Sequence, residues 1–357
     1  MSHIINFSAG PSILPKTVFE QASQAVLDLN GSGLSILEIS HRSSYFEPIL
    51  HEAGQLVREL LGLSDDFEVL FLGGGASTQF FMTVMNLLPE GRKAAYVDTG
   101  VWSAKAIHEA KMLGEIDVIA SSKDKNYSYI PKGFDISPDY QYLHTTSNNT
   151  IYGTQWQNWP DSPIPMVCDM SSDIFSKPIE PHRFGLIYAG AQKNLGPAGV
   201  TLVIVRKDVL GKVNKILPTM LRYETHAQND SMYNTPPVFP IYVSMLTLRW
   251  LRDLGGLGMM QSINERKAKY IYDIIDTIPF YIGHSLPEDR SRMNVTWNLE
   301  DREFDKEFLT FCQDAGCDGL KGHKSVGGFR ASIYNAMSED GVKVLAEVMK
   351  EFALKHA

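Results

Sequence analysis

Seven short apolar runs, alternating with helical patterns, occupy the first two-thirds of this 357-residue chain. Continuous apolar runs of this length are typical of strands that are buried on both faces, and the helical segments between them supply the crossovers of parallel strands. The pattern therefore predicts an α/β fold in which a mostly parallel seven-stranded sheet lies between helices. The runs span residues 67–72, 93–97, 116–120, 140–144, 164–168, 184–188 and 200–205.

The pattern changes after Pro236-Pro237, where two long helices are expected at 238–254 and 259–278. A glycine-rich segment, 255–258, separates them, and strand and helix patterns alternate from there to the end of the chain. A chain of this length can bury two separate cores. We predict an N-terminal arm (1–15), a large domain (16–255) and a smaller C-terminal α/β domain (256–357).

One lysine, Lys193, lies alone among small residues and glycines directly after the sixth apolar run. The preceding run ends in Asp169. An ε-amine becomes nucleophilic at neutral pH when desolvation or nearby cations lower its pKa. A lysine amine and a carboxylate at the ends of two buried strands are the groups that a pyridoxal-phosphate enzyme uses to attach its cofactor and to hold the ring nitrogen protonated. A lysine in an ordinary turn and a carboxylate that caps a helix are the alternative interpretations.

Three further candidates follow other apolar runs. The turn Gly73–Ser77 joins a strand to a helix, where free backbone N–H groups and the helix dipole favour a phosphate. Trp102 lies at the next such junction and could stack on a flat ring, although most tryptophans simply pack in a core. Thr150 lies in a loop. Because ligands of open α/β sheets bind at the carboxyl ends of the strands, these positions, together with Asp169 and Lys193, predict one shared site.

Charge and cysteine content limit the class of partner. The formal net charge of −8 disfavours nucleic acid or an anionic membrane, because both require clustered Lys and Arg. The three cysteines fit a reducing compartment, and the N-terminus lacks the basic and apolar regions of a signal peptide. No spacing of His or Cys resembles a metal site. We expect a cytoplasmic protein without a metal or a membrane span.

Basic residues from separate segments could form an anion pocket if the fold brings them together. They are His41-Arg42, His323-Lys324 and Arg330. An arginine can bind a carboxylate through two parallel hydrogen bonds, so one of these residues could hold a substrate carboxylate. Scattered surface charge is the alternative for each of them.

Seven segments, spread over essentially the whole chain, give it a resemblance to a known family. They are Asn6–Pro11, Ile39–Ser43, Gly73–Ser77, Asp169–Ser172, Gly190–Gly199, Tyr233–Pro237 and Gly322–Asn335. The chain resembles the phosphoserine aminotransferases, which are fold-type I, class V pyridoxal-phosphate enzymes. The resemblance implies a fold-type I aminotransferase architecture with pyridoxal 5'-phosphate as the cofactor.

The resemblance also implies roles around the cofactor ring. Lys193 would form a Schiff base with the cofactor, and Asp169 would pair with the ring nitrogen. Trp102 would stack on the ring, and Thr150 would form a hydrogen bond with it.

The cofactor phosphate would be held by residues of two subunits. Ala76, Ser77 and Gln192 would contact it from one chain. Asn234 and Thr235 would reach it from the neighbouring chain, so the resemblance implies an obligate homodimer with shared sites.

The implied substrate contacts involve the basic residues. Arg330 would bind the α-carboxylate. His41, Arg42, His323 and Lys324 would surround the substrate phosphate or the distal carboxylate of glutamate.

The implied reaction transfers an amino group between L-glutamate and 3-phosphooxypyruvate, and yields O-phospho-L-serine and 2-oxoglutarate in serine biosynthesis. It would be a ping-pong reaction through the Schiff base of Lys193, whose freed amine would move a proton as general base and acid. Three positions depart from the pattern of some family members. Ala9 replaces a serine, Ser77 an arginine, and Lys324 an arginine, so that contacts at 324 would be those of a point charge.

Two other classes of protein remain open on sequence grounds. Another class V enzyme, such as an alanine–glyoxylate aminotransferase or a cysteine desulfurase, shares the cofactor residues. A desulfurase needs a reactive cysteine on a mobile loop, whereas Cys312 and Cys317 lie around the end of a helix and are interpreted as packing residues. A non-catalytic cofactor-binding protein would lack Arg42 and Arg330, and both are present here.

Overall fold

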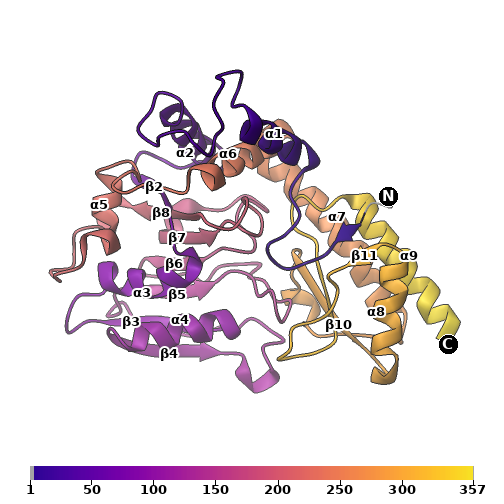
Figure 1. Ribbon diagram of the computed structural model, residues 1–357. Helices are drawn as coiled ribbons and strands as arrows, with labels where there is room; N and C mark the ends of the chain where they lie inside the picture. Colours follow the sequence, from indigo (N-terminus) through magenta and orange to yellow (C-terminus); the bar gives the residue numbers. More distant parts are fainter. Residues whose placement is uncertain (1–3, 357) are drawn as a thin grey trace.

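A seven-stranded sheet lies at the centre of the larger part of the molecule (Figure 1). The computed structural model describes residues 4–356. The strands span Phe67–Leu72 (β2), Lys93–Asp98 (β3), Glu115–Ser121 (β4), Leu143–Thr146 (β5), Met166–Asp169 (β6), Phe184–Gly190 (β7) and Thr201–Arg206 (β8). Their order across the sheet is β2-β8-β7-β6-β5-β3-β4, which confirms the predicted α/β class and the seven strands.

Strand β8 runs against all the others. It pairs antiparallel with β2 and β7, whereas the remaining neighbours pair parallel. The carboxyl ends of β2, β3, β5, β6 and β7 therefore lie at one edge of the sheet. Thr146 pairs with Asp169, and Asp169 pairs with Tyr188, so three neighbouring strands are aligned at that edge. This is the edge at which open α/β sheets bind ligands.

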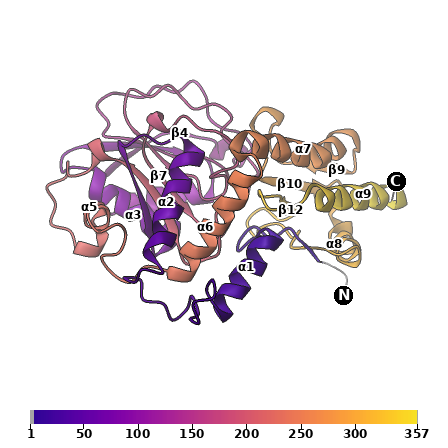
Figure 2. The same cartoon turned by 90° about the horizontal axis from the view of Figure 1, so that it is seen from above.

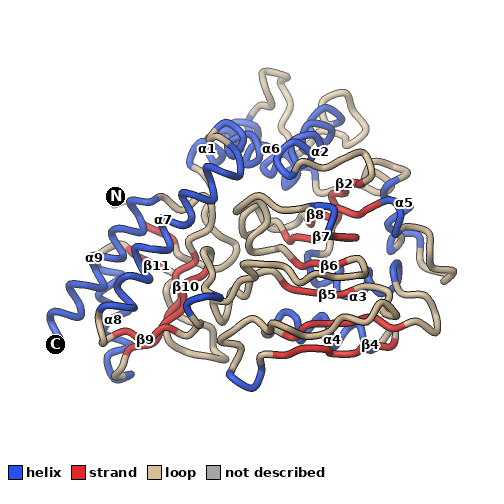
Figure 3. The backbone as a smooth tube through the Cα atoms, turned by 180° about the vertical axis from the view of Figure 1, so that it is seen from behind, coloured by secondary structure: helices blue, strands red, loops and turns tan. Residues whose placement is uncertain are grey.

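Helices cover both faces of this sheet, and Figure 3 shows them in blue around the red strands. Two buried apolar clusters separate them from the strands, one on each face. Helices α1 (Lys16–Leu27), α2 (Glu47–Leu61) and α6 (Val238–Asp253) contribute to the first cluster. Helices α3 (Gly75–Leu87), α4 (Val101–Lys111) and α5 (Tyr223–Ala227) contribute to the second. The continuous apolar strands are thus explained by burial on both sides.

The C-terminal part has a core of its own beside the large sheet (Figure 2). Its three-stranded sheet has the order β12-β10-β9 and is antiparallel. The elements are α7 (Gly256–Thr277), β9 (Tyr281–Gly283), β10 (Asn294–Leu299), α8 (Asp305–Asp314), β12 (Phe329–Ser332) and α9 (Glu339–His356). Aromatic side chains fill this core, and Phe308 contacts both Trp297 and Phe329.

One local feature differs from the sequence-based expectation. The predicted irregular arm contains a short strand, β1 (Ile5–Asn6), that pairs parallel with β11 (Cys317–Asp318) of the C-terminal part. Helix α4 begins at Val101, and the hydroxyl of Ser103 in its first turn accepts the N–H of Gly100 at 2.9 Å. The break between α6 and α7 falls at Gly255, where φ is +111°. The domain boundaries at 15/16 and 255/256 stay a prediction.

The described residues contain neither a membrane-spanning helix nor a cluster of metal ligands. No helix within 4–356 is long and apolar enough to cross a membrane. The same residues contain no group of three or more His, Cys, Asp or Glu side chains that could hold a metal ion.

Candidate active site

The turn that carries Lys193 begins directly after β7 and is held from two sides. Ser12 of the N-terminal arm donates its backbone N–H to the carbonyl of Gln192 at 3.0 Å, and its hydroxyl to the carbonyl of Lys193 at 2.5 Å. From the C-terminal part, the N–H of Asn335 donates to Oδ1 of Asn194 at 3.0 Å. The backbone on both sides of Lys193 is therefore fixed by segments far away in the sequence.

The Lys193 side chain is half-buried, and the charges of Asp169 and Asp173 act on it. Burial lowers the pKa of Lys193, and the positive charge of Arg330 lowers it further, while Asp169 and Asp173 oppose this shift. A lowered pKa increases the fraction of neutral amine at physiological pH, and the neutral amine is the form that attacks a carbonyl or accepts a proton.

Asp169 is the last residue of β6 and is buried. Its Oδ1 accepts the N–H of Ser171 at 2.9 Å and the hydroxyl of Ser171 at 2.6 Å. That hydroxyl oxygen also accepts the N–H of Gly190 at 3.0 Å, which ties the carboxylate to the strand before Lys193. Burial raises the pKa of Asp169, and the charge of Lys193 lowers it. Within 4–356 no hydrogen bond reaches Oδ2, so this oxygen remains available to a ligand N–H.

Trp102 lies in the first turn of α4 and faces the loop of Thr150. Its indole N–H donates to Thr150 Oγ1 at 2.9 Å. The amine of Lys193 lies 5.4 Å from the centre of the indole ring, and the amine of Lys105 lies 4.7 Å from it. The structure thus brings Trp102, Thr150 and Lys193 together, as the sequence predicted.

The N-terminus of α3 is the candidate phosphate site. The N–H groups of its first turn, which includes Ala76 and Ser77, have no partner within the helix, and the helix dipole adds partial positive charge. Gly74 precedes the helix with φ of +93°, and a Cβ at this position would overlap Thr78. Ser77 lines a cavity of about 650 Å³ together with Lys105 and other residues of α4.

Asn234 and Thr235 are exposed and lie elsewhere on the same chain. They line a cavity of about 290 Å³ with Gly73, Gly74 and Thr78. This cavity does not include Ser77 or Lys105. Within one chain, the two residues therefore line a different cavity from the one that Ser77 lines.

Arg330, on β12, connects the C-terminal part with the large sheet. Its Nη1 donates to the carbonyl of Thr150 at 3.0 Å. Its Nε is buried and has no hydrogen-bond partner among residues 4–356. A buried, unpaired guanidinium N–H is costly, and an anionic ligand that accepts from it would remove that cost.

His323 lies close to several cations. Burial lowers its pKa, and three neighbouring positive charges lower it further. These charges belong to Arg330, Lys324 and Lys105. The fold therefore gathers the basic residues of β12, the loop before it and helix α4 into one region that favours an anion.

His41 and Arg42 are not part of this region in the single chain. Their loop lies between α1 and α2, away from β10 in Figure 1. No hydrogen bond or ion pair found within 4–356 joins either residue to Arg330 or to the loop of His323. Nε2 of His41 is buried and has no hydrogen-bond partner in that range.

Two polar residues of this region were missed by the sequence reasoning. Lys105 lies one helical turn after Trp102, and that spacing is the only signal that could have identified it. Asp173 is buried four residues after Asp169; it accepts from the hydroxyl of Ser147 and from Nε2 of Gln155 at 3.0 Å. No local pattern distinguishes Asp173 from an ordinary turn carboxylate.

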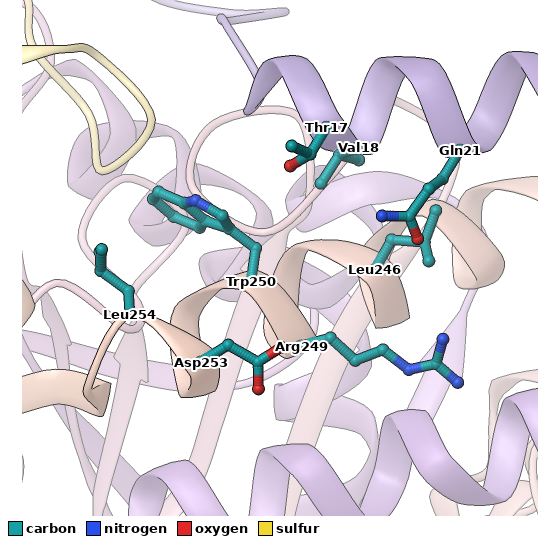
Figure 4. A pocket seen from close by; sticks show the side chains of 8 residues that line it. All are labelled: Thr17, Val18, Gln21, Leu246, Arg249, Trp250, Asp253 and Leu254. Atoms are coloured by element: carbon teal, nitrogen blue, oxygen red, sulfur yellow. The ribbon is translucent and has the colours of Figure 1, made fainter.

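A separate groove of about 530 Å³ lies between α1 and α6 and contains none of the candidate site residues. In Figure 4, the indole of Trp250 faces Thr17 and Val18 of α1, while Arg249 extends away from it. Arg249 forms two hydrogen bonds of 2.5 Å with Glu52 of α2. The groove is thus a feature of helix packing rather than of the strand-end site.

Comparisons with known proteins agree with this geometry. A curated phosphoserine aminotransferase of Flavobacterium psychrophilum is 54% identical over 351 residues, which cover 98% of this chain and 99% of the relative. A solved phosphoserine aminotransferase, studied for radiation damage of its Schiff base, superposes with a TM-score of 0.97 at 50% identity, over 99% of this chain and all of its own. The pyridoxal-phosphate-bound phosphoserine aminotransferase of Trichomonas vaginalis gives 0.93 at 37% identity, over 98% and 100%.

These superpositions confirm the predicted fold-type I architecture. Residues 4–345 match the family model described as aminotransferase class-V. With this match over nearly the whole chain, and with relatives at more than half identity, the chain belongs to the class-V aminotransferase family.

Proposed function

We propose that this chain transfers the amino group of L-glutamate to 3-phosphooxypyruvate, using pyridoxal 5'-phosphate, and releases O-phospho-L-serine and 2-oxoglutarate in serine biosynthesis. The observation that carries the proposal is the convergence of Lys193 and Asp169 with Arg330 beside Trp102. The names of the most similar relatives support the substrates. A role in another aminotransferase reaction has no specific observation in its favour.

The residues present fit the cofactor. Within residues 4–356 Oδ2 of Asp169 has no hydrogen bond and can accept the ring N–H. The N–H groups of Ala76 and Ser77 at the start of α3 have no partner within the helix and can bind the phosphate, and Gln192 directly precedes Lys193. The Lys193 amine lies within reach of the same indole ring on which a flat cofactor would stack. When bound, pyridoxal phosphate supplies a carbonyl that takes up an amino group and a protonated ring that withdraws electrons from the substrate Cα.

Each residue of the site has a defined task in this proposal. Arg330 binds the α-carboxylate through the N–H that has no partner among the described residues. Nζ of Lys193 accepts the proton from the Cα of glutamate in the first half-reaction. In the second half-reaction it donates a proton to the Cα of the new amino acid. Its lowered pKa favours this role. Asp169 holds the ring-nitrogen proton. His323 and Lys324 attract the distal carboxylate of glutamate or the phosphate of the second substrate, both of which are anionic.

We also propose a cytoplasmic homodimer with shared sites. Apolar side chains on α1 and the loop after it are exposed, with 52% of Phe19, 75% of Leu27 and 65% of Leu37 accessible. A second copy that covers them could bring its own Asn234, Thr235 and His41-Arg42 loop to the site. Sedimentation analysis should give the mass of two chains, and a stable monomer with full activity would refute the shared site. The three buried, free cysteines are consistent with a reducing compartment.

An absorbance titration tests the proposed chemistry. The purified protein loaded with the cofactor should show a yellow band that disappears when glutamate is added and returns with 3-phosphooxypyruvate. Lys193→Ala should lose the band after gel filtration. Lys350→Met, which replaces a solvent-accessible lysine of α9, should keep it. A normal band in Lys193→Ala would disprove the assignment, and faster turnover of glyoxylate than of 3-phosphooxypyruvate would exclude the proposed substrate.

A further inference from the structure

One buried residue, Asn335, contacts two of the three segments that carry the site residues, the first through its backbone N–H and the second through its side chain, and it belongs to the third. Its N–H donates to Oδ1 of Asn194 at 3.0 Å. Its Nδ2 donates to the carbonyl of Phe175 at 2.9 Å, and its Oδ1 accepts Nδ2 of Asn264 at 2.9 Å. Asn335 itself follows β12 by three residues. Its N–H and both polar atoms of its side chain are therefore in use, although its side chain touches none of the groups that would react.

The first partner of Asn335 controls the lysine turn. Asn194 is the neighbour of Lys193, and its Nδ2 donates to the carbonyl of Ser172 at 3.3 Å. Asn194 thus joins the turn after β7 to the turn after β6, and the N–H of Asn335 fixes its side-chain orientation.

The second partner lies in the turn after Asp169. Phe175 is buried and has φ of +60°, a left-handed conformation that is unfavourable for a bulky residue. Such a conformation persists only where the surroundings enforce it. The hydrogen bond from Asn335 to the Phe175 carbonyl is one contact that does so.

The segment of Asn335 is itself fixed within the C-terminal part. The amine of Lys267 on α7 is fully buried and donates to backbone carbonyls of this segment: Ile333 at 3.0 Å, Tyr334 at 2.7 Å and Met337 at 3.1 Å. This segment continues directly from the strand of Arg330. The position of Asn335 is therefore coupled to that of Arg330 through rigid backbone.

We propose that Asn335 is a positioning residue that holds the turns of Lys193 and Asp169 at a fixed distance from Arg330. The inference rests on the proposed function, because in that reaction Arg330 anchors the substrate while Nζ of Lys193 must reach its Cα. Two anchors on different parts of the fold give productive geometry only if their separation is fixed, and an error of about 1 Å can cost about 100-fold in rate.

The test uses the cofactor-loaded full chain with Asn335→Ala, which removes the side-chain bonds to Phe175 and Asn264 and keeps the backbone bond to Asn194. The rate at which glutamate removes the absorbance band should fall by about tenfold or more, whereas inhibition by glutarate should change by less than about threefold. Glutarate carries two carboxylates but no amino group, so it reports binding at Arg330 without chemistry. The pH midpoint of the band without substrate should also shift, because the distance from Lys193 to Asp169 changes.

A matched control separates positioning from stability. Asn86 is also a buried amide with three hydrogen bonds, to the carbonyls of Met82 and Leu221 and from the N–H of Tyr223, and it touches none of the three segments. Asn86→Ala should lower the melting temperature comparably but leave the rate and the pH midpoint unchanged. Equal rates in Asn335→Ala and Asn86→Ala, or a loss of glutarate binding as large as the loss of rate, would overturn the proposal.

A milder variant covers the case in which Asn335→Ala does not fold. Asn264→Ala removes the bond to Oδ1 of Asn335 and one to the carbonyl of Ser176, and should show the same pattern with a smaller loss of rate. An unchanged rate in a folded Asn264→Ala would also count against the proposal. If the native protein does not respond to glutamate, the proposed function itself fails; if the native protein responds and the variants respond equally, only the positioning role fails.

Discussion

Trp102 and Thr150 are joined by a 2.9 Å hydrogen bond from the indole N–H to the threonine hydroxyl, while the carbonyl of the same threonine accepts from Arg330 at 3.0 Å. Thr150 thus connects the proposed stacking surface for the cofactor with the proposed carboxylate anchor. The two surfaces come from α4 and β12, and the orientation of each depends on this one loop residue.

Replacement of Thr150 by valine tests this connection. Thr150→Val preserves the shape but leaves the indole N–H without its acceptor, so the affinity for pyridoxal phosphate should weaken by about 2- to 12-fold, the equivalent of one hydrogen bond of about 0.5–1.5 kcal/mol. The dissociation constant follows from an absorbance titration of cofactor-free protein. Thr247→Val is the control, because its buried hydroxyl donates to the carbonyl of Val243 within α6. Equal affinities in all three proteins would refute the prediction.

Asp169→Asn should lower the rate of amino transfer but raise the free energy of unfolding at neutral pH. The rate of amino transfer should fall by about 100-fold or more, because the neutral amide cannot stabilise a charged ring. In the cofactor-free protein, burial raises the folded-state pKa of Asp169 above its unfolded value, so the folded state binds more protons and the free energy of unfolding falls as pH rises through that window. The variant should therefore be more stable than the native chain at neutral pH and similar to it below pH of about 4.

Urea unfolding at several pH values checks the stability part of that prediction. Asp173→Asn is the matched control, since Asp173 is a second buried carboxylate of raised pKa. It should show the pH effect on stability with a smaller loss of rate. A native-like rate in Asp169→Asn would contradict its proposed role.

Arg330→Lys should raise the KM for glutamate by about 10- to 150-fold, the equivalent of about 1.5–3 kcal/mol for a hydrogen bond to a charged group. Lysine keeps the charge but cannot offer two parallel N–H groups to a carboxylate. Arg290→Lys is the control, because Arg290 also has a buried Nε without a partner within 4–356, but it pairs with Asp276 away from the site. Steady-state kinetics of both variants measure the KM for glutamate. An equal change in KM in the two variants would argue against a carboxylate site at Arg330.

Lys105→Ala should raise the pKa of His323. Burial lowers this pKa first, but the charge of Lys105 contributes, so its removal shifts the titration of His323 upward. NMR titration of the imidazole measures the shift directly. Lys111→Ala, a charge removal at the C-terminal end of the same helix, should leave the titration unchanged. A titration of His323 that is unaffected by Lys105→Ala would place Lys105 outside the group of basic residues around His323.

The gathering of the site residues at the carboxyl ends of the strands could be predicted because it follows from local patterns. Lys193 and Asp169 each follow an apolar run, and parallel strands bring their carboxyl ends to one edge. The same reasoning placed Trp102 and Thr150 correctly beside Lys193. Residue roles at these positions stay predictions.

Contacts between distant segments could not be predicted in this way. Ser12 and Asn335 hold the lysine turn from segments 181 and 141 residues away from their partners, and neither has a local signal. The β1–β11 pair has only two residues in each strand, which is too short for a recognisable alternation. The sequence groups His41 and Arg42 with the other basic residues of a predicted anion pocket. One chain alone, however, does not bring these two residues to Arg330.

The reversed direction of β8 gives the Lys193 turn a property that the other strand-end segments lack. The chain leaves the sheet after β7 and returns into its immediate neighbour, and the N–H of Ala191 closes the base of the turn by donating to the carbonyl of Val200 at 3.0 Å. A loop anchored at both ends in adjacent strands loses its conformational entropy once, when the protein folds. In the proposed reaction, the Lys193 amine would therefore return to the same place after each catalytic cycle without a new ordering cost.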